Sequence, residues 1–412
     1  MMKNLTIFAA VAASVLAVGC AKNEVIQNES PQQAVTFSVY NGQMATKAVS
    51  ATTFNQINTT ALLQSSVGFG VFGYYSEGTA NVYDGSNFTP NFMYNQKVSY
   101  SASAWSYTPV KYWPNEYDET TAIGAQTDKL TFAAYAPYAT ILDASATPVT
   151  ISDGAETPAA ATEGITSISK NNVTGDPTVT FKVPASSAEQ IDLLWADNSV
   201  SGIQNLVKPT TGSATTFSFK HALSKLMLYP VVVVNTTGTI PASNGNNVAS
   251  GTVVKVNSIT ISGQFNKEGT LNLITGAWTS SAAASAQTVT YTAPVGGLDV
   301  TSINDKAEAD ADANSDGKPD GLCAEFMFIP SSSAQNYVIT INYDYTTTDA
   351  ALDGGSVTIH NTIHKTLSSV SFLVGKQMKL YIGLGLNNVV FDAAVADWTN
   401  DSPQEIWLPV NL

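Results

Sequence analysis

The sequence lacks arginine: its 18 basic residues are all lysine, against 32 acidic residues, and the formal net charge is -14. Without guanidinium groups the chain cannot form the bidentate clamps that arginine makes on phosphates and carboxylates. An acidic chain also repels phosphate backbones, so no binding to nucleic acid is expected. Charged residues make up only 12% of the chain, about half the usual share.

Cysteine is nearly absent as well. The chain has two, Cys20 and Cys323. If Cys20 is modified, as argued below, no intrachain disulfide is possible and stability must come from packing. Cys323 lies in a strand-like apolar run, where we expect a small buried side chain and not a reactive thiol.

The motifs of common enzymes are also missing. The chain has no G-x-S-x-G elbow, no G-x-G-x-x-G after a strand and no Walker loop. His360 and His364 lie in a β-branched run, where four residues of strand separate them by about 13 Å, too far to share a zinc ion. We interpret His221 as a packed or capping residue. An enzyme is therefore not expected.

The chain begins with a pattern typical of exported proteins. An apolar run over residues 5–18 follows a positively charged start and is too short to span a bilayer as a helix. Cys20 directly follows small residues in a pattern that resembles a bacterial lipobox, although Ala17 replaces the usual leucine. The resemblance implies a signal peptide (1–19) and a lipidated tether (20–33). The alternative is an ordinary signal peptide that contains a cysteine.

Beyond the tether, the sequence predicts short β-strands. Val35, Phe37 and Val39 alternate with polar residues, and turn residues separate the later apolar runs. Strands are predicted at residues 35–40, 67–75, 131–135, 178–183, 231–234, 253–262, 288–292, 325–329, 337–345, 356–363 and 379–386. One short segment, 221–226, is a candidate helix. Many strands without alternating helices indicate an all-β sandwich protein.

A segment rich in Gly, Thr, Ser and Pro, residues 199–214, is the best candidate for a domain boundary. We therefore predict an N-terminal domain at 34–210 and a C-terminal domain at 211–412.

Several short sequence segments, spread in order along nearly the whole chain, are characteristic when taken as a set. They are residues 69–75, 111–114, 130–138, 192–197, 217–226, 374–384 and 395–398. Each consists mostly of core-forming residues, but the ordered set resembles the fimbrillin family of Bacteroidetes surface lipoproteins, the subunits of type V pili. The resemblance implies two transthyretin-like β-sandwich domains in tandem and a structural subunit of a cell-surface fimbria that supports adhesion.

The resemblance also implies an assembly mechanism. In such pilins a trypsin-like protease removes the N-terminal strand, and a terminal strand of the next subunit fills the groove that opens. Here the cut would fall between Lys47 and Ala48, and the displaced strand would carry Val35, Phe37 and Val39. An arginine-specific protease would not cut at lysine. The alternative is that Lys47 is an ordinary solvated lysine and is not a cleavage site.

The end of the chain supplies a candidate donor strand. Ile406, Leu408, Val410 and Leu412 alternate with other residues up to the last position. Chain ends are usually polar and frayed, so this pattern is unusual. The alternatives are a strand that pairs within its own domain and a disordered tail.

An acidic loop suggests a metal site. Asp312, Asn314, Asp316 and Asp320 fit the start of a calcium-binding loop, although the closing glutamate of an EF-hand is missing. Calcium is thus the one cofactor considered. The alternative is a solvated acidic turn.

Together with the signal pattern, the resemblance to fimbrillins implies a lipoprotein precursor at the outer membrane that is incorporated into a fimbrium on the extracellular face. Its partners would be other fimbrial subunits, in a homopolymer or a mixed polymer, the membrane through lipid on Cys20, and host or bacterial surface ligands. The alternatives are a non-polymerising lipoprotein that binds glycan or a host ligand, and a fimbrial anchor subunit. A glycan site would expose the aromatic residues clustered at 88–117, which otherwise fill a core.

Overall fold

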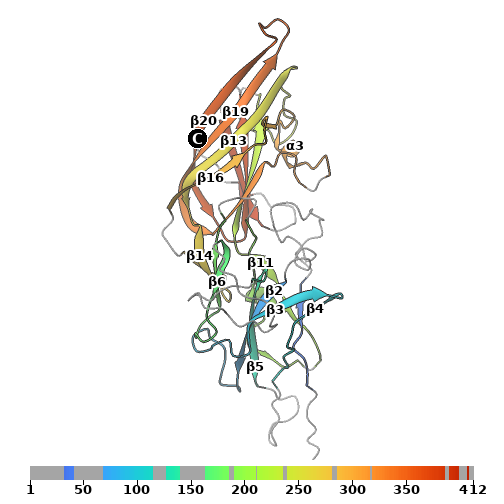
Figure 1. The fold of residues 1–412 in the computed structure, drawn as a ribbon, viewed down its shortest axis with the longest axis vertical. Coiled ribbons are helices and arrows are strands. Elements are labelled where there is room, and N and C mark those ends of the chain that lie inside the picture. Colours follow the sequence, from blue (N-terminus) through green and yellow to red (C-terminus); the bar gives the residue numbers. More distant parts are fainter. Residues whose placement is uncertain are drawn as a thin grey trace, which may run out of the picture.

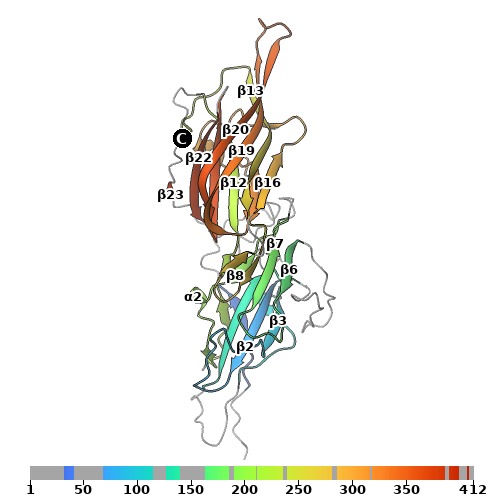
Figure 2. The same ribbon diagram turned by 90° about the vertical axis from the view of Figure 1, so that its left-hand side faces the viewer.

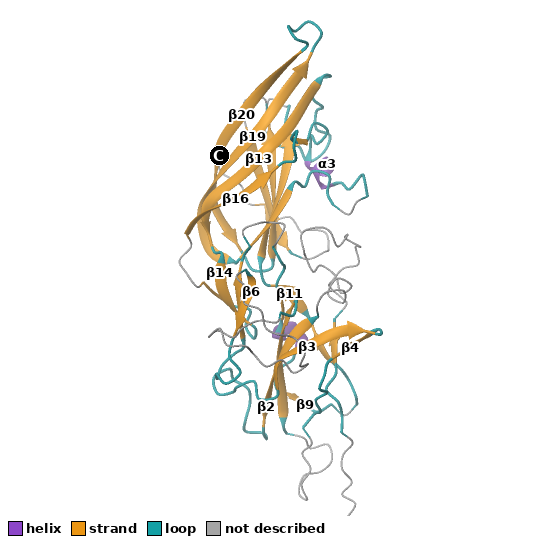
Figure 3. Cartoon of the chain, viewed as in Figure 1, coloured by secondary structure: helices purple, strands orange, loops and turns teal. Residues whose placement is uncertain are grey.

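The structure of the chain is a computed structural model. The structure describes residues 32–40, 68–114, 127–139, 163–184, 190–209, 211–234, 239–280, 285–315, 318–385, 389–398 and 406–407. These residues form almost exclusively β-structure, arranged in two lobes along an elongated molecule (Figures 1 and 3). The helices α2 (Asn198–Ser201) and α3 (Lys306–Asp310) are short, and no helix of the described part could cross a membrane. The expected all-β fold is confirmed.

The lower lobe in Figure 1 is built on a seven-stranded sheet. Its strands in spatial order are β11 (Phe219–His221), β8 (Leu194–Ala196), β5 (Lys129–Ala136), β2 (Phe69–Ser76), β3 (Met93–Ser101) and β4 (Ala104–Ser106), and β9 (Leu206–Val207) also pairs with β5. Along β5, Leu130 and Phe132 face one core whereas Ala133 and Tyr135 face another. The sheet is therefore buried on both faces, which explains why β5 is apolar without a break over residues 132–136.

A four-stranded sheet covers one face of this sheet. Its order is β15 (Trp278–Ser280), β14 (Glu268–Asn272), β7 (Thr178–Lys182) and β6 (Gly164–Ile168). Although β14 and β15 come from the later part of the chain, β14 pairs with β7 along its whole length. The Trp278 indole N–H also donates to the Ala222 carbonyl at 2.7 Å. This hairpin, which belongs to the predicted C-terminal domain, therefore pairs with a strand of the predicted N-terminal domain. The boundary at 210/211 stays a prediction.

The upper lobe consists of two five-stranded sheets packed face to face (Figure 2). One has the order β18 (Ala324–Phe328), β12 (Ser224–Val232), β21 (Lys376–Leu384), β22 (Val389–Asp397) and β23 (Ile406–Trp407). The other has the order β16 (Ser285–Thr292), β13 (Thr252–Phe265), β19 (Ser331–Thr348) and β20 (Ser356–Phe372), with β17 (Leu298–Asp299) paired to β13. Inward-facing aliphatic and aromatic side chains of both sheets form the largest core of the described residues.

The candidate helix at 221–226 is wrong, because β11 ends at His221 and β12 begins at Ser224. Along β12, Leu226 packs in the core between the sheets and Met227 packs in a cluster on the opposite face. Burial with a period of two on both faces favours a strand over a short helix.

The histidines fit the expectation of non-catalytic roles. His360 and His364 lie on β20 and contact Asp344 and Thr340 across the β19–β20 pair, at 2.6 and 2.8 Å. His221 lies at the junction of the lobes, where its ring stacks on Trp398 at 3.9 Å between centroids.

Cys323 packs against the upper core, and burial raises the pKa of its thiol well above the usual value. The thiolate, which is the reactive form, is therefore disfavoured.

Candidate functional site

The candidate site is a groove in the lower lobe that residues 32–40 fill. The centre of this segment is β1 (Phe37–Val39), which pairs in parallel with β10 (Thr215–Phe217). The N–H of Thr215 donates to the Thr36 carbonyl at 2.8 Å, and the N–H of Tyr40 donates to the Phe217 carbonyl at 2.9 Å. The paired strands are 178 residues apart in the sequence, as shown by the hydroxyl contact between Ser38 and Thr216.

The other edge of the segment also has a backbone partner. The N–H of Val35 donates to the Lys111 carbonyl, and the N–H of Trp113 donates to the Gln33 carbonyl, both at 2.9 Å. The Tyr107 hydroxyl donates to the Val35 carbonyl at 2.8 Å. The segment is thus inserted between two distant parts of the chain and is not the edge of a hairpin.

The inward face of the segment closes one core of the lower lobe. Val35, Phe37 and Val39, the predicted displaced strand, are only 1%, 5% and 8% exposed. The Phe37 ring lies 5.4, 5.4 and 5.3 Å from the rings of Tyr107, Phe132 and Phe217. Aromatic contacts at these distances add to the stabilisation from burial. The alternation read from the sequence is present, and the displacement of the strand stays a prediction.

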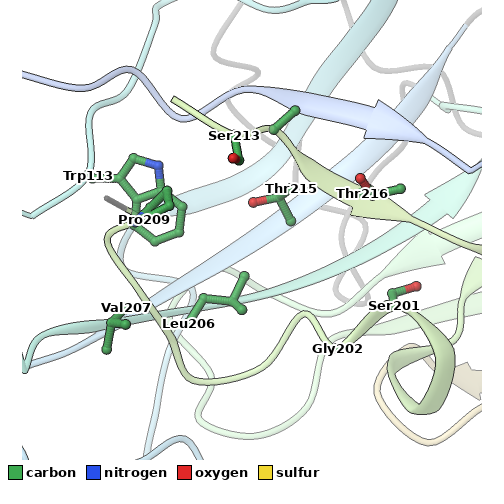
Figure 4. Close-up of a pocket in the computed structure, with 10 residues that line it drawn as sticks. Trp113, Ser201, Gly202, Leu206, Val207, Pro209, Ser213, Thr215 and Thr216 are labelled. Atoms are coloured by element: carbon green, nitrogen blue, oxygen red, sulfur yellow. The ribbon is translucent and has the colours of Figure 1, made fainter. Parts of the chain in front are cut away.

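An open pocket of about 280 Å³ continues this groove (Figure 4). Its lining includes Trp113, Leu206, Val207, Pro209, Ser213 and Thr215. Trp113 donates to the Gln33 carbonyl at the start of the inserted segment, and Thr215 pairs with Phe37 at its centre, so the pocket borders the first half of the groove. Trp113 is 4% exposed, and its indole nitrogen has no hydrogen-bond partner among the described residues.

The helix α2 forms one wall of the pocket through Ser201, and Gly202 follows it. Asp197 caps the helix by accepting a hydrogen bond from the Ser199 N–H at 2.9 Å, and Gly202 ends it with a φ of 59°, a conformation that favours glycine. Burial acts to raise the pKa of Asp197, but hydrogen bonds from Lys220 and Ser199 outweigh it and hold the pKa below its usual value.

Replacing Asp197 with alanine is expected to lower the free energy of unfolding by about 1 kcal/mol at neutral pH, because the helix loses its cap. The lowered pKa means that the carboxylate stabilises the fold above its unfolded pKa of about 4, and this contribution is lost as the pH falls through the folded pKa. Urea titrations at pH 7 and at pH 2.5 measure the difference. Asp353→Ala, at an exposed turn, is the control. An equal loss at both pH values would contradict the assignment.

Several predicted site residues lie outside the described part of the chain. They are Cys20, Lys47, Ala48, Asp316, Leu408, Val410 and Leu412. Of the candidate donor strand, Ile406 is described as part of β23, where it pairs with Val395 of β22. The donor role, the cut and the lipidation stay predictions.

The acidic loop is described in part. The N–H of Ala313 donates to the Asp320 carboxylate at 3.0 Å, and the N–H of Asp320 donates to the Ala311 carbonyl at 2.6 Å. Among the described residues no group of three or more His, Cys, Asp or Glu side chains is placed to hold a metal ion. Calcium at Asp312, Asn314, Asp316 and Asp320 stays a prediction, because Asp316 is not described.

The alternating residues at 35–39 predict the inserted strand, but no pattern in the sequence predicts either of its edges. β10 has three residues and lies beside the Ser- and Thr-rich segment that was interpreted as a boundary. Trp113 was part of an aromatic cluster with two interpretations, and the structure buries it and places Tyr107 against the same core. Tyr112, between the two hydrogen bonds of the outer edge, is 47% exposed.

Comparison with known proteins gives consistent results. Residues 46–398 match the model of a family described as fimbrillin-like. The fimbrium subunit Fim1C of Phocaeicola vulgatus is 27% identical over 219 residues, which are 52% of this chain and 48% of that protein. The match thus spans about half the length of this relative. A solved structure of a fimbrial protein from Bacteroides vulgatus shares the fold, with a TM-score of 0.60 at 21% identity, over 89% of this chain and 100% of that chain.

Proposed function

This chain belongs to the fimbrillin-like family, and we propose that it is a subunit of a cell-surface fimbria that polymerises when a strand from a neighbouring subunit replaces β1. The family is structural, and the chain is not an enzyme. In this proposal the partners are other fimbrial subunits, and the polymer supports adhesion to host or bacterial surfaces.

The inserted segment is the observation that carries the proposal. Residues 32–40 contact the lobe through backbone hydrogen bonds to β10 on one edge and to residues 111–113 on the other. Lys47 follows them in the sequence, before β2 begins. A single cut after Lys47 would therefore detach both this strand and the lipid-bearing Cys20 from the remaining chain. One proteolytic step would release the subunit from the membrane and leave the groove dependent on non-covalent contacts.

The chemistry of the C-terminal segment matches what the groove requires. Its inward row needs apolar side chains at every second position, and Ile406, Leu408, Val410 and Leu412 supply four of them. Full burial of four such side chains stabilises a complex by roughly 6–12 kcal/mol before the costs of association. In the described chain, β23 pairs with β22 at only two positions, Ile406 and Trp407.

The described residues give less support to a glycan-binding lipoprotein. Such a site needs exposed aromatic rings. Trp105 and Tyr107 instead pack against the core that β1 closes and Trp113 is buried in it, whereas Tyr112 is 47% exposed. The anchor alternative differs only in that the chain would keep its lipid on Cys20.

The proposal predicts that protein purified from cell surfaces begins at Ala48. Lys47→Gln is expected to remain lipidated at Cys20 and to form no fimbriae, because the groove stays closed by its own strand. N-terminal sequencing and intact mass establish the start, and electron microscopy establishes polymer formation. Lys365→Gln, at an exposed position of β20, is the matched control. Polymers built from uncut chains would contradict the proposal.

A further inference from the structure

We infer that the pocket that borders the groove binds the terminal apolar side chain of the incoming C-terminal segment of a second copy of this chain. This inference rests on the proposed function and specifies where the incoming strand is anchored.

The resident segment leaves this pocket open. Its inward row has three apolar residues, Val35, Phe37 and Val39. The next position of the same row is Gln33, whose side-chain amide donates instead to the Thr211 carbonyl at 3.3 Å. Gln33 is not part of the pocket lining, whereas Trp113, which donates to the Gln33 carbonyl, is. The groove therefore offers one more apolar position than its own strand fills.

The incoming segment has one more apolar residue than the resident one. Ile406, Leu408, Val410 and Leu412 form a row of four at the same two-residue spacing. If three of them take the places of Val35, Phe37 and Val39, the fourth extends beyond the row, where the pocket lies. A strand that runs parallel to β10 places Ile406 there, and an antiparallel strand places Leu412 there.

The chemistry of the pocket fits a peptide better than a sugar. Leu206, Val207 and Pro209 give it an apolar wall. Three of its hydroxyl groups are already hydrogen bonded, Ser201 to the Ser218 N–H at 2.8 Å, Ser213 to Thr211 at 3.1 Å and Thr216 to Ser38 at 2.7 Å. The buried indole N–H of Trp113 remains as a donor. One aliphatic side chain and one backbone carbonyl satisfy such a site, whereas a sugar brings several hydroxyl groups that need partners.

The open pocket also provides a starting point for strand exchange. Because the resident segment does not occupy it, an incoming side chain can bind there while β1 is still in place. Exchange can then proceed along the groove, position by position, without a stage in which the whole core is exposed to water.

The test uses the full chain cut after Lys47 and a fluorescent peptide with the sequence of residues 404–412. Ser213→Phe fills the pocket from its exposed rim, and Ser213→Ala removes the same hydroxyl but leaves the pocket open. We expect Ser213→Phe to weaken peptide binding at least tenfold and to slow its association, with Ser213→Ala close to wild type. Fluorescence anisotropy gives both quantities, and thermal unfolding checks that each variant is folded.

Peptide variants identify the residue that enters the pocket. The affinities of two peptides, one with Ile406→Ala and one with Leu412→Ala, are measured for the Ser213→Ala and the Ser213→Phe proteins. We expect one of these two peptides to bind both proteins with the same affinity, because it lacks the side chain that enters the pocket. The same peptides are also measured with the wild-type protein, for which truncation of the anchoring residue should weaken binding by roughly 10- to 100-fold.

Different results would overturn the proposed function and the assignment of the pocket. If the wild-type peptide does not bind the cut wild-type protein, the proposed function fails. If it binds but the filled and open pockets bind it equally, or neither peptide variant is coupled to the pocket, the inference is overturned while the proposed function stands.

Discussion

Deletion of residues 406–412 is expected to convert the subunit into a cap that accepts a neighbour's strand but cannot extend the polymer. The deletion removes the row of four apolar side chains, whose burial in a neighbour contributes roughly 6–12 kcal/mol before association costs. The groove and its edges, β10 and residues 111–113, are in the other lobe and are unchanged. The truncated chain should therefore fold and be cut as the wild type is.

Electron microscopy of mixtures measures this effect. Truncated subunits alone should give no fimbriae, and a minor fraction of them added to the full-length protein should shorten the polymers in proportion. A matched pair of variants locates the effect on one face of the segment. Leu408→Asp with Val410→Asp should abolish polymerisation, whereas Pro409→Asp with Asn411→Asp adds the same charge to the opposite face and should permit it. Equal behaviour of the two pairs would exclude strand insertion.

The sequence could predict features that depend on neighbouring residues. The alternation of Val35, Phe37 and Val39 is a local pattern, and it correctly indicated a strand with one buried face. The all-β class follows from many such patterns. The misassigned segment at 221–226 shows the limit of this approach, because β12 is buried on both faces and its apolar run is compatible with either a helix or a strand.

Features that depend on distant residues could not be predicted. The partner of β1 is a three-residue strand 178 positions away, and no local pattern identifies that pairing. The β14–β15 hairpin joins a sheet with β6 and β7, so a division of the chain by composition does not correspond to the sheets. Gln33 donates to the Thr211 carbonyl and does not line the pocket beside Trp113, which only the folded geometry shows.

Replacing Phe37 with alanine is expected to have the largest effect of any single change in the groove. Its ring is 5% exposed and contacts three other rings, so truncation creates a cavity in the core that β1 closes. Loss of a buried phenylalanine of this kind lowers the free energy of unfolding by about 3–5 kcal/mol. Ser38→Ala, which points outward and loses only a hydroxyl contact with Thr216, is the control and should cost less than about 1 kcal/mol.

The same substitution separates a structural role from a role in exchange. In the uncut chain, denaturant titration should show the lower lobe destabilised. After the cut, the resident segment should leave the groove more than a hundredfold faster, because the missing ring contacts no longer hold it, and polymerisation should be faster than in the wild type. A residue needed only for folding would slow assembly instead, and that result would contradict the proposed displacement.

In the proposed exchange, assembly would be directional because the resident row has three apolar residues to bury and the incoming row has four. One additional residue, about 1.5–3 kcal/mol, favours the incoming strand by roughly 10- to 150-fold. Phe37→Ala increases that difference, and its effect on the rate of polymerisation measures how far the strength of the resident strand controls assembly.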